Sequence, residues 1–373
     1  MKTECKRWLE RKIARIQSLE TYGEEKTNES IAKQFGLSPS QILKLNYNEN
    51  LYLPREKIVH LFKEVAEECD LRIYPQEEEL KLKAEIGKYL NLPDECIAIG
   101  NSSDEVMDRI IRIFLERGNK AVTFTPTFSV FKYCVNYAGA EFIGLPLRDD
   151  FTIDLIAMRG AFTADARLLY LCSPNNPTAS QLKQDEVETL TEEFPGIVLV
   201  DEAYVEYADY SVVPLINKYE NLIVLRTFSK TFGLAGLRLG YAIANPKLAT
   251  TIDTLPIPYP VNVVSMSMGR KLLENYSMVQ ESLQALKVER VKLISRLNEI
   301  NGIEAFDSKA NFVLFNAEKP AEEIYLSLLK KGLVIKKLGR LLKYQNCLRS
   351  TVGLPGMNKK LLKALKEYLS DEK

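Results

Sequence analysis

Short apolar runs alternate with helix-length segments through the middle of this chain, and that alternation limits its fold more than any other feature. The apolar runs that we predict to be strands are residues 96–99, 120–124, 141–144, 167–172, 197–200, 222–226 and 238–243. The helices expected among them are residues 55–69, 76–90, 103–115, 127–137 and 181–194. Strands that alternate with helices form parallel sheets covered on both faces. The pattern therefore predicts an α/β fold, with a mostly parallel sheet flanked by helices in a large domain.

The rest of the chain predicts a smaller unit and an N-terminal segment. After residue 260, a long helical region to about residue 300 leads into strands and helices typical of a small α+β domain. Its strands are expected at 311–315, 333–336 and 347–351, and its helices at 320–330 and 357–370. Helical spacing predicts two more helices at 2–20 and 28–35. We divide the chain into a segment that packs on the small domain, 1–45, a large domain, 46–260, and an interdomain helix with the small domain, 261–373.

Composition excludes several classes of function. Lys plus Arg and Asp plus Glu number 50 each, so no net charge favours nucleic acid or an anionic membrane as a partner. No apolar run is long enough to span a bilayer, and the charged N-terminus lacks a signal-peptide core, which indicates a cytoplasmic protein. The six cysteines have no CxxC spacing and the only histidine is His60, so we expect neither a metal site nor a histidine-dependent triad.

Three of the predicted strands end in polar residues that could form one site. Strand 167–172 is followed by an amide side chain, strand 197–200 by an acid and a phenol, and strand 222–226 by a lysine. These residues are Asn176, Asp201, Tyr204 and Lys230. Ligands of open α/β sheets bind beyond the carboxyl ends of the strands, so the four side chains can converge on one ligand. A lysine with an acid, a phenol and an amide around it suits a carbonyl cofactor bound as a Schiff base.

Each member of this set also has an ordinary structural explanation. Lys230 could become a nucleophile and base if burial near Arg238 lowered its pKa, although most lysines are simply solvated. Asp201 could keep a pyridine nitrogen protonated, or it could cap a turn after its strand. Tyr204 and Asn176 could hydrogen-bond a phenolic ring oxygen, or they could serve in packing and in a turn.

A second set of residues is typical of a phosphate site. Residues 97–105 predict a strand, a turn and a helix start, and the amides of a helix N-terminus bind phosphate. Ser102 could instead cap this helix. Arg238 lies in a glycine-rich turn, where it could bind a phosphate bidentately or pair with a surface acid. Phe128 begins the helix after another strand and could stack on a flat ring or pack in the core.

Together these segments resemble the fold-type I aminotransferases, which use pyridoxal 5′-phosphate. The resemblance extends from about residue 16 to residue 352, which is nearly the whole chain. The segments that carry it are Thr227–Lys230 with Gly233–Arg238, Ser173–Thr178, Asp201–Tyr204 and Leu348–Gly353. The NPxNPTG segment of the family is altered at two positions, where Ser173 replaces the first asparagine and Ala179 replaces the glycine.

The resemblance implies a role for each site residue. The implied catalytic residues are Lys230, Asp201 and Tyr204. The implied cofactor-binding residues are Ser102, Ser103, Asp104, Phe128, Asn176, Asp201, Tyr204, Thr227, Ser229, Lys230, Arg238 and Tyr74. Residues 46–260 would then be the cofactor-binding domain. Tyr74 lies in a segment that resembles the family's RYP, whose tyrosine reaches the cofactor phosphate of the neighbouring subunit, so a homodimer with shared active sites is expected.

Within the family, the chain is most similar to the histidinol-phosphate aminotransferases. The segments that carry this similarity are Ser18–Tyr22, Leu45–Asn50, Arg72–Pro75 and Gly100–Glu105. The similarity implies amino transfer between histidinol phosphate and 2-oxoglutarate, a step of histidine biosynthesis. The implied substrate-binding residues are Tyr22, Asn50, Lys336 and Arg349. Lys336 stands where these enzymes usually have an arginine, and a lysine binds phosphate as a point charge without the bidentate fork.

Three alternatives remain open at this stage. The same residues could serve an aromatic or other amino acid as the amino donor. Threonine-phosphate decarboxylase, a lyase, shares the architecture and the motifs, although the N-terminal tyrosine segment favours the aminotransferase. A non-catalytic regulator that binds the cofactor is the third alternative, but the sequence shows no appended DNA-binding domain of the kind such regulators usually carry.

Overall fold

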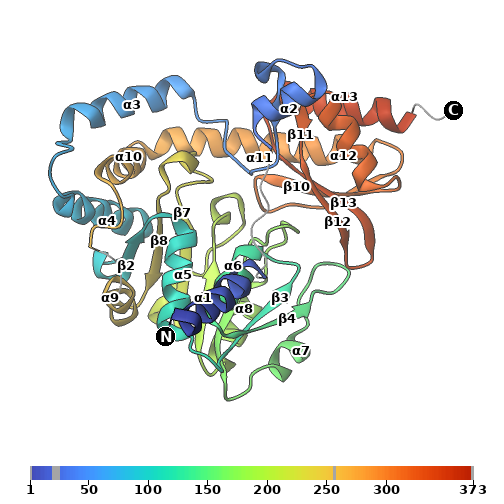
Figure 1. The fold of residues 1–373 in the computed structure, drawn as a ribbon. Helices are drawn as coiled ribbons and strands as arrows, with labels where there is room; N and C mark the ends of the chain where they lie inside the picture. Colours follow the sequence, from blue (N-terminus) through green and yellow to red (C-terminus); the bar gives the residue numbers. More distant parts are fainter. Residues whose placement is uncertain (1, 19–25, 255–257, 371–373) are drawn as a thin grey trace.

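The computed structural model describes residues 2–18, 26–254 and 258–370. Its larger sheet has seven strands in the order β2-β8-β7-β6-β5-β3-β4 (Figure 1). These strands are β2 (Ile97–Gly100), β3 (Lys120–Thr125), β4 (Glu141–Pro146), β5 (Ala166–Cys172), β6 (Ile197–Asp201), β7 (Leu222–Thr227) and β8 (Gly240–Ala244). Strand β8 pairs antiparallel with both of its neighbours, and the remaining pairs are parallel. The predicted α/β fold with a mostly parallel sheet is confirmed.

Helices cover both faces of this sheet. Strands β7 and β8 are buried at every position, which requires cover on both sides. The helices are α3 (Arg55–Glu68), α4 (Gln76–Leu90), α5 (Ser102–Phe114), α6 (Ser129–Ala138), α7 (Leu155–Gly160), α8 (Gln184–Glu193), α9 (Pro246–Thr254) and α10 (Val263–Glu274). Helices α7 and α9 were not predicted from the sequence. Within the described ranges, no helix has both the length and the apolar character needed to cross a bilayer.

A smaller antiparallel sheet lies beside the larger one, in the order β12-β13-β10-β9. Its strands are β9 (Ile303–Ala305), β10 (Phe312–Ala317), β12 (Lys336–Leu341) and β13 (Tyr344–Thr351), and the helices α12 (Ala321–Lys330) and α13 (Pro355–Ser370) pack on it. The long helix predicted from residue 261 to 300 is interrupted at Asn275, between α10 and α11 (Tyr276–Asn298). The Asn275 side chain donates a hydrogen bond to the Lys271 carbonyl, which competes with continuation of the helix.

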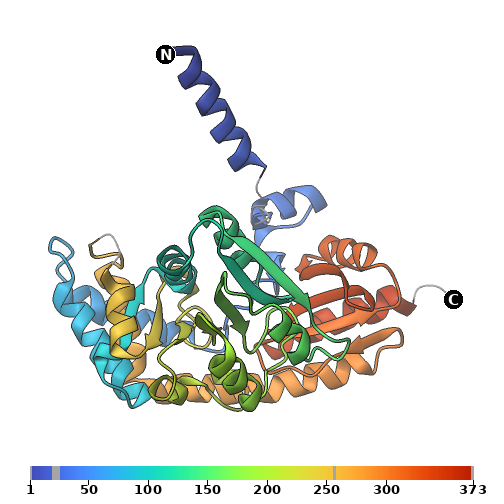
Figure 2. The same cartoon turned by 90° about the horizontal axis from the view of Figure 1, so that it is seen from below.

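The N-terminal residues form two separate structures. Helix α2 (Asn28–Phe35) packs on the small unit through Ile31, and β1 (Leu43–Lys44) pairs with β11 (Leu333–Val334). Helix α1 (Lys2–Gln17) projects away from the rest of the chain (Figure 2), and its side chains from residue 4 onward are exposed. We expected residues 1–45 as a whole to pack on the small domain. Helix α1 does not, and its apolar side chains Trp8, Leu9, Ile13 and Ile16 are exposed together with its charged ones. The domain boundaries stay a prediction.

Candidate active site

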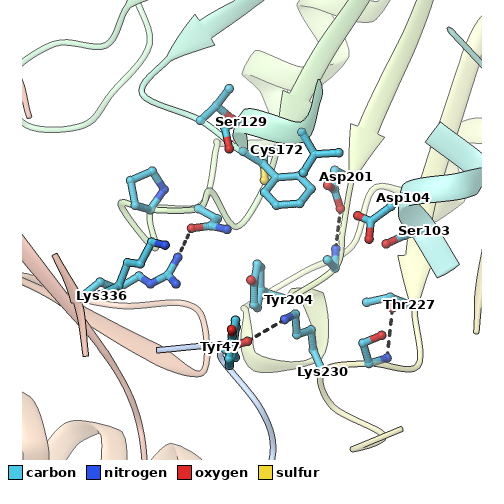
Figure 3. A pocket seen from close by; sticks show the side chains of 18 of the residues that line it. Tyr47, Ser103, Asp104, Ser129, Cys172, Asp201, Tyr204, Thr227, Lys230 and Lys336 are labelled. Atoms are coloured by element: carbon cyan, nitrogen blue, oxygen red, sulfur yellow. Dashed lines mark hydrogen bonds between the residues drawn. The ribbon is translucent and has the colours of Figure 1, made fainter. Parts of the chain in front are cut away.

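A cavity of about 700 Å³ lies where the strands of the large sheet end, and the small sheet closes its other side (Figure 3). This volume is in the range of small-molecule sites. Most of the residues predicted for the site line it. They are Ser103, Asp104, Phe128, Asn176, Asp201, Tyr204, Thr227, Ser229, Lys230 and Arg238 from the large unit, with Lys336 and Arg349 from the small unit. The carboxyl ends of β5, β6 and β7 bring the first group together, because parallel strands end at the same edge of a sheet.

Lys230 stands in the cavity wall three residues after β7. Its Nζ donates a hydrogen bond to the Tyr47 carbonyl at 3.0 Å and lies 5.8 Å from the centre of the Tyr204 ring (Figure 3). Burial lowers the pKa of Lys230 to about 8, and the nearby guanidinium of Arg349 contributes to the shift. At pH 7 roughly a tenth of the molecules would therefore carry the uncharged amine, far more than for a solvated lysine. An uncharged amine can attack a carbonyl carbon and can accept a proton.

Asp201 is the last residue of β6, and its carboxylate is fixed by two donors. Its oxygens accept hydrogen bonds from the Tyr170 hydroxyl at 2.7 Å and from the Ala203 amide at 3.0 Å. The Tyr170 ring is itself held by stacking on Phe131 at 4.2 Å. Burial nevertheless raises the pKa of Asp201 to about 6. A buried acid in this state would be stabilised in its ionised form by a cation placed next to it.

Tyr204 and Asn176 are each held by a residue that lies far away in the sequence. The Tyr204 hydroxyl accepts a hydrogen bond from Asn48 Nδ2 at 3.0 Å, and burial raises its pKa far above the usual range. Tyr204 is therefore a neutral phenol that can donate a hydrogen bond. Asn176 Oδ1 accepts a hydrogen bond from Arg349, and the other end of that guanidinium donates to the Asn46 carbonyl at 2.8 Å. The two Arg349 contacts join the large and small units across the cavity.

The residues predicted to bind phosphate form one end of the cavity. Arg238 pairs with Asp104 at 2.8 Å, so its guanidinium already faces this region. The Ser229 hydroxyl is buried and has no hydrogen-bond partner among the described residues. A side chain at Gly240 would clash with the Ser103 amide nitrogen, so only glycine lets β8 approach the start of α5 this closely. A guanidinium, an unsatisfied hydroxyl and a helix N-terminus together suit an anion.

Comparison with known proteins identifies the family. A model of the family described as aminotransferase class I and II matches residues 40–369. The chain belongs to this family. Among relatives of this aminotransferase, the histidinol-phosphate aminotransferase of Caldanaerobacter subterraneus subsp. tengcongensis is 33% identical over 88% of this chain and 93% of its own length. The enzyme of the same name from Bacillus subtilis strain 168 is 32% identical over 95% of this chain and 98% of its own length.

Solved structures agree with this assignment. The histidinol-phosphate aminotransferase of Sinorhizobium meliloti, in complex with pyridoxal-5′-phosphate, has a TM-score of 0.85 and 26% identity, and the match covers 95% of this chain and 96% of that one. An L-threonine-O-3-phosphate decarboxylase from Porphyromonas gingivalis shares the fold, with a TM-score of 0.76 and 22% identity over 88% of this aminotransferase and 100% of its own chain. The predicted family, fold type and enzyme class are confirmed.

Three of the predicted site residues in the described ranges do not line the cavity of this aminotransferase, and a fourth lies outside those ranges. Asn50 donates to the Thr231 carbonyl at 2.7 Å and to the Ser282 hydroxyl, so its amide joins backbone segments. Ser102 is buried as the first residue of α5. Tyr74 is 79% exposed and stacks on a neighbouring tyrosine. The fourth, Tyr22, lies outside the described residues.

Several cavity residues of this aminotransferase were missed. They are Asn46, Tyr47, Thr127, Ser129, Tyr133, Cys172, Leu338 and Leu341, among others. Two signals could have found some of them. Cys172 is the last residue of an apolar strand, the same position that identified Asp201. Asn46 and Tyr47 lie in the 45–50 segment that carries the resemblance to histidinol-phosphate aminotransferases, from which only Asn50 was selected.

Proposed function

We propose that this aminotransferase uses pyridoxal 5′-phosphate to transfer an amino group between histidinol phosphate and 2-oxoglutarate, as a cytoplasmic homodimer in histidine biosynthesis. The observation that carries the proposal is the composition of one cavity. A lysine of lowered pKa and a buried acid lie on its large-unit side, and two cationic residues, Lys336 and Arg349, lie on its small-unit side. The histidinol-phosphate aminotransferases among the relatives, and the Sinorhizobium meliloti enzyme solved with pyridoxal-5′-phosphate, support the same donor and cofactor.

The residues of the cavity fit the proposed cofactor. The unsatisfied Ser229 hydroxyl and the Arg238 guanidinium would bind the phosphate, together with Ser103 and Thr227. Asp201 would hold a protonated ring nitrogen. That neighbouring cation would stabilise the ionised carboxylate, whose pKa is raised by burial. The ring oxygen would accept hydrogen bonds from Tyr204 and Asn176, and Phe128 would lie on the ring face. When bound, pyridoxal phosphate supplies a carbonyl carbon and a ring that accepts electron density.

The remaining steps belong to residues of the chain. Lys230 would first hold the cofactor covalently, and once released it would take the proton from Cα of the amino donor and return it later in the cycle. Arg349 would bind the carboxylate of glutamate and, together with Lys336, the phosphate of histidinol phosphate. The two cationic residues are direct partners in the β12–β13 ladder, so they present their charges side by side.

A donor screen tests this proposal. Purified protein with pyridoxal phosphate would be given 2-oxoglutarate and one donor at a time, namely histidinol phosphate, phenylalanine, tyrosine or threonine phosphate. Formation of glutamate and release of carbon dioxide would be measured in parallel. We expect the highest kcat/KM for histidinol phosphate and no carbon dioxide release. A higher value for an aromatic donor would replace the proposed substrate, and carbon dioxide release from threonine phosphate would favour the lyase.

Replacing Lys336 separates recognition of the two substrates. Lys336→Ala is expected to lower kcat/KM for histidinol phosphate by roughly tenfold or more, because a charge-assisted hydrogen bond contributes on the order of 1.5–3 kcal/mol. Glutamate should be much less affected, because Arg349 supplies its carboxylate contact. The measurement is kcat/KM for each substrate in the variant and in the wild type.

Two further variants control this experiment. Lys336→Arg should keep or improve use of histidinol phosphate, because it restores a bidentate donor. The adjacent Lys337 pairs with Glu322 and does not line the cavity, so Lys337→Ala should leave both substrates unchanged. Equal losses for histidinol phosphate and glutamate in Lys336→Ala would mean that Lys336 has a structural role.

Exposed apolar residues around Tyr74 support the proposed homodimer. Leu71 is 72% exposed, Ile73 is 67% exposed, and Leu80 nearby is 60% exposed. Apolar side chains gathered on a surface in this way mark interaction sites. A second copy of the chain that covered this region would bury these side chains and would bring Tyr74 to the cofactor phosphate of its neighbour.

Subunit mixing tests the shared site. Tyr74→Phe and Lys230→Ala subunits are each expected to be badly impaired alone, and mixing them should restore some activity. The reason is that one site of each hybrid dimer has both residues intact. Hybrids would be isolated with two different affinity tags and assayed for transamination. Tyr137→Phe, at an exposed tyrosine on α6, should keep normal activity without mixing. Hybrids that are no more active than their parents would contradict sharing.

A further inference from the structure

Phe151 is a bulky residue held in an unfavourable backbone conformation. Its φ is +66°, in the left-handed region that favours glycine and disfavours large side chains. It lies in the turn after β4, which is closed by hydrogen bonds between Arg148 and Thr152 and from the Phe151 amide to the Arg148 carbonyl. Glycine or asparagine would adopt this conformation at lower cost. Strain of this kind persists where surrounding contacts hold the residue in place.

The ring contacts of Phe151 come from the small unit. The Phe151 ring lies 5.0 Å from the Phe306 ring at an angle of 88°, and 5.7 Å from the Tyr344 ring. Phe306 and Tyr344 are themselves 4.7 Å apart, so the three rings form one cluster. Edge-to-face pairs at such distances are attractive. Only 7% of Phe151 remains exposed, although the residue sits in a surface turn.

This ring cluster supports the hairpin formed by β12 and β13. Leu338 and Leu341 of the hairpin pack against the cluster and also line the cavity. The tip of the hairpin lies beside the turn that carries Phe151 (Figure 1). The cluster therefore connects the large unit directly to the cavity wall that carries Lys336.

Strand β12 is held from two sides, by β13 and by helix α12, where Lys337 pairs with Glu322. It is the outer strand of the small sheet, so only β13 pairs with it. Its ladder with β13 is irregular between Lys337 and Gly339 and again between Gly339 and Leu341. An edge strand with an interrupted ladder depends on side-chain packing for its course. Toward the large unit, that packing includes the ring cluster, in which Phe151 is the residue contributed by the large unit.

We propose that Phe151 is a positioning residue for the amino donor. Its ring fixes the β12–β13 hairpin against the large unit, so that Lys336, Leu338 and Leu341 face the cavity. The proposal rests on the proposed function in one respect, since it takes Lys336 as the contact for the substrate phosphate. Without the ring, the hairpin occupies the binding-competent position for less of the time, and apparent affinity falls in proportion.

Hydrogen exchange of the hairpin tests the positioning role without any substrate. In the holoenzyme, Phe151→Ala and Phe151→Gly should speed amide exchange in residues 337–347 by roughly tenfold or more, since exchange follows the population of locally open states. The glycine variant is the sharper one, because it relaxes the turn while removing the ring. If Phe151 mattered only for the turn, Phe151→Gly would leave exchange at the wild-type rate or slow it, and the proposal would be wrong.

Steady-state kinetics test the consequence for substrate binding. Both variants should raise KM for histidinol phosphate by roughly tenfold, as expected if the hairpin is in place about a tenth of the time, with little change in kcat. KM for glutamate should rise less, because Arg349 lies within the better-paired part of β13. Phe151→Leu keeps part of the apolar volume and should give intermediate values, which guards against a folding failure in the smaller variants. A fall in kcat at unchanged KM would contradict the proposal.

A matched control comes from a second ring pair on the large unit. Phe162 and Phe194 lie 5.0 Å apart at 80°, which is close to the geometry of Phe151 and Phe306, and neither belongs to the ring cluster at the hairpin. Phe162→Ala should leave hairpin exchange and KM unchanged. If wild-type enzyme does not use histidinol phosphate while the Phe151 variants still speed hairpin exchange, the proposed donor fails and the positioning role stands. Unchanged exchange in those variants refutes the positioning role, whichever donor the enzyme uses.

Discussion

Lys230→Ala is expected to abolish transamination and to remove the adduct that borohydride traps between the protein and pyridoxal phosphate. The reason is that Lys230 is the amine of lowered pKa in the cavity, and no other lysine side chain of the described large unit lines it. Wild-type protein should be yellow with the cofactor bound, and peptide mapping after reduction should find the modification on Lys230. An adduct that survives the substitution would rule out this assignment.

The pH dependence of cofactor capture gives a second readout. Because burial lowers the pKa of Lys230 to about 8, the reactive uncharged amine forms as the pH rises through that value. The rate of capture by apo-protein should rise between about pH 7 and 8 and level off above about pH 9, whereas a solvated lysine would continue to gain reactivity up to about pH 10.4. Lys287, whose pKa is also lowered by burial but which lies outside the cavity, gives the matched control. Lys287→Ala should keep both the adduct and the pH profile.

Asp201→Ala is expected to lower kcat by roughly a hundredfold, because the loss of a charge-assisted hydrogen bond of up to about 3 kcal/mol corresponds to about two decades in rate. Without the carboxylate, nothing on β6 would keep the cofactor ring nitrogen protonated. Asp201→Glu should be milder, because it keeps the charge. The measurement is kcat at saturating substrate, together with the absorbance spectrum of the bound cofactor.

Tyr170→Phe is the control that separates the charge of Asp201 from its orientation. It removes the hydrogen bond of 2.7 Å to the carboxylate and leaves the acid in place. Its effect on kcat should be much smaller than that of Asp201→Ala. Turnover close to the wild-type value in Asp201→Ala would exclude the proposed role of the acid.

The strand ends of the large sheet could be predicted because their signal is local. An apolar strand must leave the core where its apolar run stops, so the first polar residues after it lie at the edge where ligands bind. Asp201 closes one such strand and Lys230 comes three residues after another, and both line the cavity. The same reasoning applies to Cys172 at the end of β5. Because cysteine counts as an apolar residue, the sequence predicts it as part of the strand and not of the site.

Residues held by distant partners could not be found in this way. Asn48 contacts the Tyr204 hydroxyl across 156 positions of sequence, and no spacing within residues 45–50 indicates which of its asparagines turns toward the cavity. The β12 strand was missed for a different reason. Its sequence, Lys-Lys-Leu-Gly-Arg-Leu, is charged and interrupted by glycine, as suits an exposed edge, so it lacks the apolar alternation of a core strand.

The contacts of residues 43–50 have a consequence for how the protein is completed during synthesis. These residues leave the ribosome well before their partners, because the Asn48 amide bonds to Thr351 and the Asn46 carbonyl bonds to Arg349, each across 303 positions. Strand β1 likewise cannot pair until β11 has been synthesised. The large sheet has all of its strands once residue 244 has emerged. The cavity wall made by Asn46 and Tyr47 cannot form until Arg349 and Thr351 have been translated, so a nascent chain that stops short of them cannot hold a complete cofactor site.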